Sequence, residues 1–134
     1  MFEGYKFKYR LNAKHSFSNG TENIHPHTFE ILLFIESNRN GGQVASYEID
    51  EIVEQFLLCY QNKYLNDISP FNQLEPTIEN MGDIFYEQLK IILSNKKFNL
   101  IQLEISETPL RVYLVSDRLM FSSITLIGGS KSNN

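Results

Sequence analysis

The chain has 134 residues, a common length for one domain, and its composition limits the classes of function open to it. Hydrophobic residues make up 42% and aromatic residues 13%, so the chain can bury a core and is not intrinsically disordered. The formal net charge is −4 and basic residues do not cluster, which argues against a nucleic-acid partner. No apolar stretch approaches the roughly 20 residues of a membrane helix, so we expect no membrane association.

Cys59 is the only cysteine, so the chain cannot form an internal disulfide. The N-terminal residues do not follow the charged-then-apolar pattern of a signal peptide. Both observations favour a cytoplasmic location. Because Cys59 follows the apolar residues Phe56 and Leu57, we expect a small buried thiol rather than a catalytic one.

Two segments near the N-terminus alternate between apolar and polar residues, the pattern of half-buried β-strands. The first spans residues 5–17 and would turn Tyr5, Phe7, Tyr9, Leu11, Ala13, His15 and Phe17 to one face. The second spans about residues 25–35 and would do the same with His25, His27, Phe29, Ile31, Leu33 and Ile35. The short loop between them favours an antiparallel pair, which would bring His15 close to the start of the second strand.

Helical spacing follows in two segments. The first helix is expected to begin with Ser46 as its N-cap and to reach about Tyr64, before residues 66–70 end it. The second begins with Thr77 as its N-cap and closes over residues 94–97. Its buried stripe would consist of Ile78, Met81, Phe85, Leu89 and Ile92.

Two further strands, about residues 98–107 and 111–116, complete the order β-β-α-α-β-β. This order predicts an α+β domain, a four-stranded antiparallel sheet with two helices on one face. An edge strand left unpaired in a monomer favours assembly through the edges. We expect a single domain over residues 1–127, in which residues 117–127 could add a strand, and a disordered tail over residues 128–134.

All histidines of the chain lie within residues 15–27. His25 and His27 are two positions apart and therefore point to the same side of a strand, and His15 would reach them from the neighbouring strand. Three imidazoles with a fourth position open form the ligand set of a catalytic zinc site. The alternative is a core or surface histidine beside a chance pair in a polar loop, and Pro26 belongs at a strand start or edge. We favour Zn²⁺ bound by the three histidines.

Five short motifs follow one another on this layout. They are Leu11-Asn12-Ala13-Lys14-His15, His25-Pro26-His27, Leu65-Asn66, Pro76-Thr77-Ile78-Glu79-Asn80 and Glu107-Thr108. The series resembles the 6-pyruvoyl tetrahydropterin synthase / 6-carboxytetrahydropterin synthase family, also called the tunnelling fold, whose patterns are F-x-A-A-H, H-G-H, L-N, P-T-x-E-N and E-T. The resemblance spans about residues 5–116. No single motif is decisive, but five in the right order are specific.

The resemblance implies a substrate and an assembly. In such proteins the E-T glutamate, here Glu107, anchors the pterin ring, and Thr108 belongs to the same substrate-binding motif. A carboxylate can accept the two parallel N–H donors of a pterin, whereas the alternative is a surface glutamate that ends a strand. The resemblance also implies a homo-oligomer in which subunits join edge to edge into a barrel, commonly trimers stacked as hexamers, with active sites at subunit boundaries.

The chain departs from the family at the residues that relay protons. Thr21 stands where members place a cysteine, four residues before His25, and Gln61 and Asn62 replace an aspartate and a histidine. These side chains do not titrate near neutral pH. Glu22 resembles the glutamate of a variant subgroup with E-x-x-H-G-H, whose product belongs to folate synthesis, and is our candidate catalytic base. The alternative is a solvated loop acid.

Two functions of different classes follow. The first is a zinc-dependent lyase acting on 7,8-dihydroneopterin triphosphate or a related pterin, with Glu107 fixing the ring and Glu22 as base. The second is a non-catalytic pterin- or metal-binding relative that has lost the relay. The retained histidines favour the enzyme, and the missing relay residues favour the binding protein.

Overall fold

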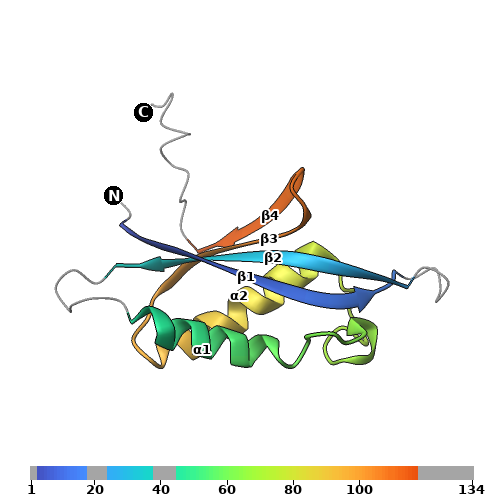
Figure 1. The fold of residues 1–134 in the computed structure, drawn as a ribbon, viewed down its shortest axis with the longest axis horizontal. Coiled ribbons are helices and arrows are strands. Elements are labelled where there is room, and N and C mark those ends of the chain that lie inside the picture. The colour runs from blue at the N-terminus through green and yellow to red at the C-terminus, as the bar shows by residue number, and fades with distance from the viewer. Residues whose placement is uncertain (1–2, 18–23, 38–44, 118–134) are drawn as a thin grey trace.

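The computed structural model describes residues 3–17, 24–37 and 45–117, which form one layer of sheet and one of helices (Figure 1). The strands pair antiparallel in the order β1-β2-β3-β4, and both helices cover the same face of the sheet. The elements are β1 (Gly4–His15), β2 (His25–Glu36), α1 (Ser46–Leu57), α2 (Ile78–Ser94), β3 (Leu100–Thr108) and β4 (Arg111–Ser116). The predicted α+β architecture is confirmed.

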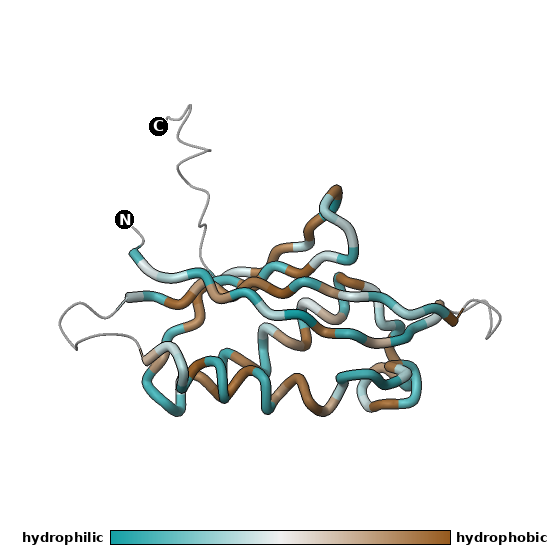
Figure 2. Tube along the Cα trace, viewed as in Figure 1, coloured by the Kyte–Doolittle hydropathy of each residue, from teal (hydrophilic) through white to brown (hydrophobic). Residues whose placement is uncertain are grey.

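Alternation along β1 and β2 decides which face of the sheet is buried, as the changing hydropathy along these strands shows (Figure 2). Tyr9 and Leu11 of β1 are buried against the helix layer, whereas Arg10 between them is exposed. In the register of the pair Leu11 lies opposite Phe29, and both are fully buried. The apolar face predicted from the sequence is therefore the one that forms the core.

Helix α1 differs from the prediction at both ends. Ser46 is the first helical residue rather than the cap, because Ala45 occupies the extended N-cap position and makes no side-chain cap bond. The helix ends at Leu57, and the chain then tightens, with the Tyr60 N–H donating to the Leu57 carbonyl over 2.9 Å. Asn62 adopts a left-handed backbone with φ 60°, which stops any continuation towards Tyr64.

The chain after α1 runs along the outer edge of β1 instead of remaining helical. The Asn62 N–H donates to the Asn12 carbonyl over 2.6 Å, and the Lys14 N–H donates to the Lys63 carbonyl over 2.8 Å. A short 3₁₀ helix, η2 (Leu65–Asp67), follows. Because the Asn62 N–H and the Lys63 carbonyl pair with β1, these two groups are not available for helical bonds.

Cys59 is exposed, so the prediction of a buried thiol is wrong. It lies on the turn after α1, between the buried residues Leu57 and Tyr60. The apolar neighbours that suggested burial, Phe56 and Leu57, belong to the helix itself, and the turn that follows exposes Leu58 and Cys59 before Tyr60 returns to the core.

Helix α2 begins as predicted, because the Thr77 hydroxyl oxygen accepts from the Asn80 N–H over 3.1 Å. The predicted stripe is buried except for Ile92, which is 36% exposed, and Leu93 is buried in its place. Gly82 and Tyr86 are buried as well. The buried face is thus rotated about the helix axis relative to the predicted stripe. Leu93 lies closer to the middle of this face than Ile92 does.

Gly82 lets α2 approach the sheet closely. A Cβ at this position would lie 2.8 Å from Cδ2 of Tyr113 and 3.1 Å from Cγ2 of Ile105. The Tyr113 hydroxyl donates to the Asp83 carboxylate over 2.7 Å, which holds the ring against the helix. The missing side chain is therefore a packing requirement of the contact between α2 and the strands β3 and β4.

We expect Gly82→Ala to lower the free energy of unfolding by about 1–2 kcal/mol, although alanine favours a helix over glycine by about 1 kcal/mol. The added methyl group meets the Tyr113 ring, which cannot move away without losing its bond to Asp83. Urea unfolding of the single variants and of the double variant with Tyr113→Leu measures this coupling. An equal cost of Gly82→Ala with and without the ring would contradict the close contact.

Several predicted features lie outside the described residues. They are the candidate base Glu22, the tail over residues 128–134, and the extra strand considered for residues 117–127, of which only Asp117 is described. Among the described helices, none is long and apolar enough to cross a membrane.

Candidate metal centre

Strands β1 and β2 bring the three histidines together where β1 ends and β2 begins. His15 lies opposite His25, and Ala13 lies opposite His27. The ring centroids are 4.7 Å apart for His15 and His25, 4.3 Å for His25 and His27, and 5.0 Å for His15 and His27. The alternation of the strands places all three rings on the side of the sheet that carries the helices.

A hydrogen bond to a loop fixes the His15 ring. Its Nδ1 lies 3.0 Å from the Pro76 carbonyl oxygen, and because a carbonyl can only accept, Nδ1 carries the proton. In neutral His15 the lone pair is therefore on Nε2. The side chain is completely buried, and among the described residues no donor bonds to Nε2, which lies 3.3 Å from Oε2 of Glu107, an acceptor when ionised. A buried lone pair without a donor is a group that a metal ion would satisfy.

Glu107, at the end of β3, completes the cluster. Its Oε2 lies 3.3 Å from Nε2 of His15 and 3.2 Å from Nε2 of His27. Potential ligand atoms of Glu107 and the three histidines all lie within 4.8 Å of one another. A carboxylate oxygen facing an imidazole lone pair is unfavourable unless positive charge stands between them. Each of the four side chains thus brings one potential ligand atom to a common cluster.

Aromatic rings shield the buried side of the cluster. The His15 ring lies edge-on to Phe17 and Phe29, with centroid distances of 4.9 Å and 5.3 Å.

Burial lowers the pKa of His27 below its ordinary value of 6.5, and the other two histidines act in the same direction, while Glu107 opposes the shift. Without a metal His27 therefore favours the neutral form, which is the form that binds one.

The residues present fit a zinc ion. Imidazole nitrogens and a carboxylate oxygen are ligands that Zn²⁺ accepts. His15 presents Nε2 to the cluster and donates its other ring N–H to a backbone carbonyl, the outer contact typical of a metal-bound histidine. Three histidines alone would leave a coordination position open, whereas Glu107 as fourth ligand would close it.

A pocket of about 380 Å³ opens beside Glu107, within the size range of small-molecule sites. It lies between the turn joining β3 and β4 and the start of α2, and its lining residues are Phe17, Thr77, Ile78, Glu79, Glu107, Thr108 and Arg111. Sequence reasoning missed Arg111, whose one signal is its position across the β3–β4 turn from the E-T motif, where it pairs with Thr108. Arg111 brings a cation to a pocket that otherwise holds two carboxylates.

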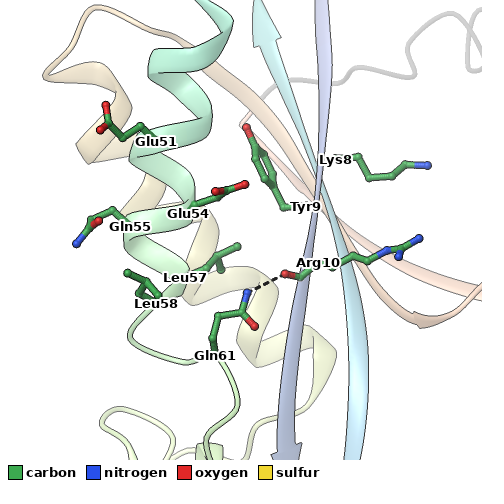
Figure 3. Close-up of a pocket in the computed structure, with 9 residues that line it drawn as sticks. All are labelled: Lys8, Tyr9, Arg10, Glu51, Glu54, Gln55, Leu57, Leu58 and Gln61. Carbon is green, nitrogen blue, oxygen red and sulfur yellow. Dashed lines mark hydrogen bonds between the residues drawn. The ribbon is translucent and has the colours of Figure 1, made fainter.

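The amides at the family's relay positions hold the edge of β1. The Gln61 side chain accepts from the Asn12 N–H over 3.0 Å and donates to the Arg10 carbonyl over 2.9 Å, the second bond being drawn in Figure 3. Both ends of this amide are thus engaged by the strand. Asn62 lines a hollow that His27 also lines, but it does not titrate.

The groove in Figure 3, between β1 and α1, is a separate feature. Tyr9 points from β1 towards α1, and its hydroxyl donates to the Asp50 carboxylate over 2.8 Å. Burial and the bond to Asp50 raise the pKa of Tyr9. Lys8 and Arg10 point away on the other side of the sheet. Five residues of strand, about 17 Å, separate Arg10 from His15, so this groove does not belong to the histidine cluster.

Comparisons with known proteins agree with the fold. A four-stranded antiparallel sheet backed by two helices in the order β-β-α-α-β-β is the tunnelling fold. Residues 4–117 match the family model described as 6-pyruvoyl tetrahydropterin synthase, so the chain belongs to that family, as its motifs predicted. Among curated proteins no significant match is found.

Solved structures share the fold at low identity. The 6-pyruvoyl tetrahydropterin synthase of Caenorhabditis elegans has a TM-score of 0.72 at 18% identity, over 88% of this chain and 97% of that one. An uncharacterized protein of Wolinella succinogenes has a TM-score of 0.68 at 11% identity, over 88% and 99% of the two chains. The 6-pyruvoyl tetrahydropterin synthase of Plasmodium falciparum has a TM-score of 0.55 at 16% identity, over 84% and 96%.

We expect the metal-free protein to lose stability as the pH falls below about 6.5. Because the pKa of His27 is lowered in the folded state, the unfolded chain takes up the proton first. The contribution of His27 is therefore complete above its ordinary pKa and is lost as the pH falls through the folded value. Urea unfolding with a chelator, from about pH 8 to about pH 5, measures the slope, which should be flatter in His27→Gln. The same slope in both proteins would assign it to other groups.

Proposed function

We propose that this protein is a zinc-dependent lyase that acts on 7,8-dihydroneopterin triphosphate or a related pterin. The observation that carries the proposal is the buried Nε2 of His15, a lone pair without a hydrogen-bond donor among the described residues and directed at the other members of the cluster. Membership of the 6-pyruvoyl tetrahydropterin synthase family supports the choice of a pterin as substrate.

His15, His25 and His27 would hold the ion. The bond from His15 Nδ1 to the Pro76 carbonyl sets the tautomer in advance, so no proton has to leave that ring on binding. The lowered pKa of His27 keeps its ring available as a ligand near neutral pH. Bound zinc supplies a Lewis acid that lowers the pKa of a substrate hydroxyl beside the carbon that loses a proton.

We assign Glu107 to the pterin ring rather than to the metal. A catalytic zinc site keeps one position open for substrate, and a fourth protein ligand would fill it. Glu107 is partly exposed and lines the pocket next to the cluster, together with Thr108. Its carboxylate can accept two parallel N–H donors from a pterin, which would orient the substrate between the pocket and the histidines.

Glu22 is the proposed base, because the amides of Gln61 and Asn62 cannot accept a proton from carbon. Glu22 precedes His25 by three residues, which keeps it close to the cluster along the chain. A carboxylate in such a position acts as a base when its surroundings raise its pKa towards neutrality.

A second candidate function is a pterin- or metal-binding protein without catalysis. The observation that favours it is the Gln61 amide, which is bonded to the β1 backbone where a relay residue is expected. The turnover experiment below separates the two functions.

We also propose that the protein is a homo-oligomer, a trimer or hexamer joined through its sheet edges. β1 and β4 are the edge strands. Leu110, Val112 and Leu114, on β4 and the turn before it, are 93%, 50% and 37% exposed. Apolar residues along an open edge favour pairing with another copy of the chain.

Glu107→Gln should leave the zinc content unchanged and weaken pterin binding roughly 100-fold, the loss of about 3 kcal/mol in charge-assisted hydrogen bonds. Elemental analysis and calorimetry with 7,8-dihydroneopterin triphosphate measure the two effects, and His25→Ala, which should lose zinc, is the matched comparison. Lost zinc together with unchanged pterin affinity would make Glu107 a metal ligand instead.

The zinc-loaded protein should convert 7,8-dihydroneopterin triphosphate, with products followed by mass, and Glu22→Gln should slow turnover about 100-fold or more. Glu51→Gln, an exposed acid on α1, is the control and should not change the rate. Undiminished turnover in Glu22→Gln removes Glu22 from the mechanism. No turnover in the wild type, with pterin still bound, would support the binding protein.

A further inference from the structure

A three-residue turn before α2 carries the carbonyl that fixes His15. The Thr77 N–H donates to the Glu75 carbonyl over 2.9 Å and closes the turn around Pro76. The Thr77 N–H and the Pro76 carbonyl belong to one planar peptide unit, in which they point in opposite directions. Holding the Thr77 N–H on Glu75 therefore aims the Pro76 carbonyl the other way, where it meets Nδ1 of His15 at 3.0 Å.

Asn80 ties this turn to the helix. Its side-chain Nδ2 donates to the Glu75 carbonyl over 2.8 Å, and its backbone N–H donates to the Thr77 hydroxyl oxygen over 3.1 Å. It therefore bonds to the residues on both sides of Pro76. Asn80 lies in the first turn of α2, an element of 17 residues, so the turn is anchored to a rigid part of the fold.

We propose that Asn80 is a positioning residue of the histidine cluster and acts on His15 through the Pro76 carbonyl. The inference rests on the proposed metal centre and extends it to a residue with no contact to the ligands. The proton stays on Nδ1 of His15 only while the turn keeps its shape. A loosened turn lets the ring move the proton to Nε2 or rotate, and either change removes the lone pair from the cluster.

The backbone at His15 is held by other means, so a change at Asn80 can be separated from a change in β1. The Asn66 side chain accepts from the Ser16 N–H and donates to the Ser16 carbonyl, both over 2.9 Å. Asn66 thus fixes the chain directly after His15 from the η2 side. Asn80 acts on the ring alone.

Asn80→Asp is the sharpest variant. It keeps the shape of the side chain but replaces the donor to the Glu75 carbonyl with a carboxylate oxygen. A negative charge in the first turn of α2 is favourable to the helix, so the variant does not weaken the helix itself. Asn99→Ala is the control, because it removes a comparable amide bond of 2.7 Å, to Glu36, where β2 ends, away from the histidines.

Two readouts test the inference. Nitrogen NMR of the metal-free protein should show His15 protonated at Nδ1 in the wild type and in Asn99→Ala, and a mixture of both tautomers in Asn80→Asp. Zinc titration should show an affinity about 10-fold lower in Asn80→Asp and unchanged in Asn99→Ala. Asn80→Ala, which removes the side-chain bond to the Glu75 carbonyl without adding a charge, provides the same readouts if the aspartate variant does not fold.

The same His15 tautomer and the same zinc affinity in the Asn80 variants as in the wild type would overturn the role of Asn80 and leave the metal centre intact. A wild type that binds no zinc would refute the metal centre, and the tautomer measurement would still decide whether Asn80 positions His15.

Discussion

The place of every candidate site residue on β1 and β2 depends on the register between these two strands. Leu11 lies opposite Phe29, both fully buried, and the same alternation turns His15 and His25 towards the helices. A shift by one residue would carry the apolar side chains and the histidines to the opposite face together. Hydrophobic packing of the apolar side chains therefore fixes the register that brings the three imidazoles together.

The strands, the two helices and the shared face of the histidines could be predicted because each follows from a local periodicity. The end of α1 could not, since Asn62 leaves the helix to pair with Asn12, fifty residues earlier. The E-T motif indicates Glu107 as a site residue, but its contacts with His15 and His27 follow from the position of β3 in the sheet, which the motif does not encode. The Pro76 carbonyl is a backbone group, and side-chain patterns carry no signal for it. The local sequence pattern thus predicts where the histidines lie, whereas contacts between distant segments determine which other groups surround them.

Gln61, which replaces a residue of the family's relay, has a structural role in this chain. Gln61 places both ends of its amide on the β1 backbone, a pair of bonds that a carboxylate could not make because it has no donor. The strand that presents His15 is thereby fastened by the residue that stands where an acid is expected. Anchoring of the metal ligands and proton transfer are separate tasks in this chain, and the proposed base, Glu22, lies between His15 and His25 in sequence, far from Gln61.

The segment that follows α1 also determines where a strand of another chain can pair with β1. The Asn12 carbonyl and the Lys14 N–H, on the outer edge of β1, already bond to the backbone of Asn62 and Lys63, and the Asn12 N–H bonds to the Gln61 side chain. A strand from another chain can pair with this half of β1 only if it first displaces the segment that follows α1. Strand addition at β1 is therefore confined to the half near Gly4. This limits the number of hydrogen bonds that β1 can form with a strand of another chain, and it keeps the end of β1 that carries His15 out of cross-β pairing.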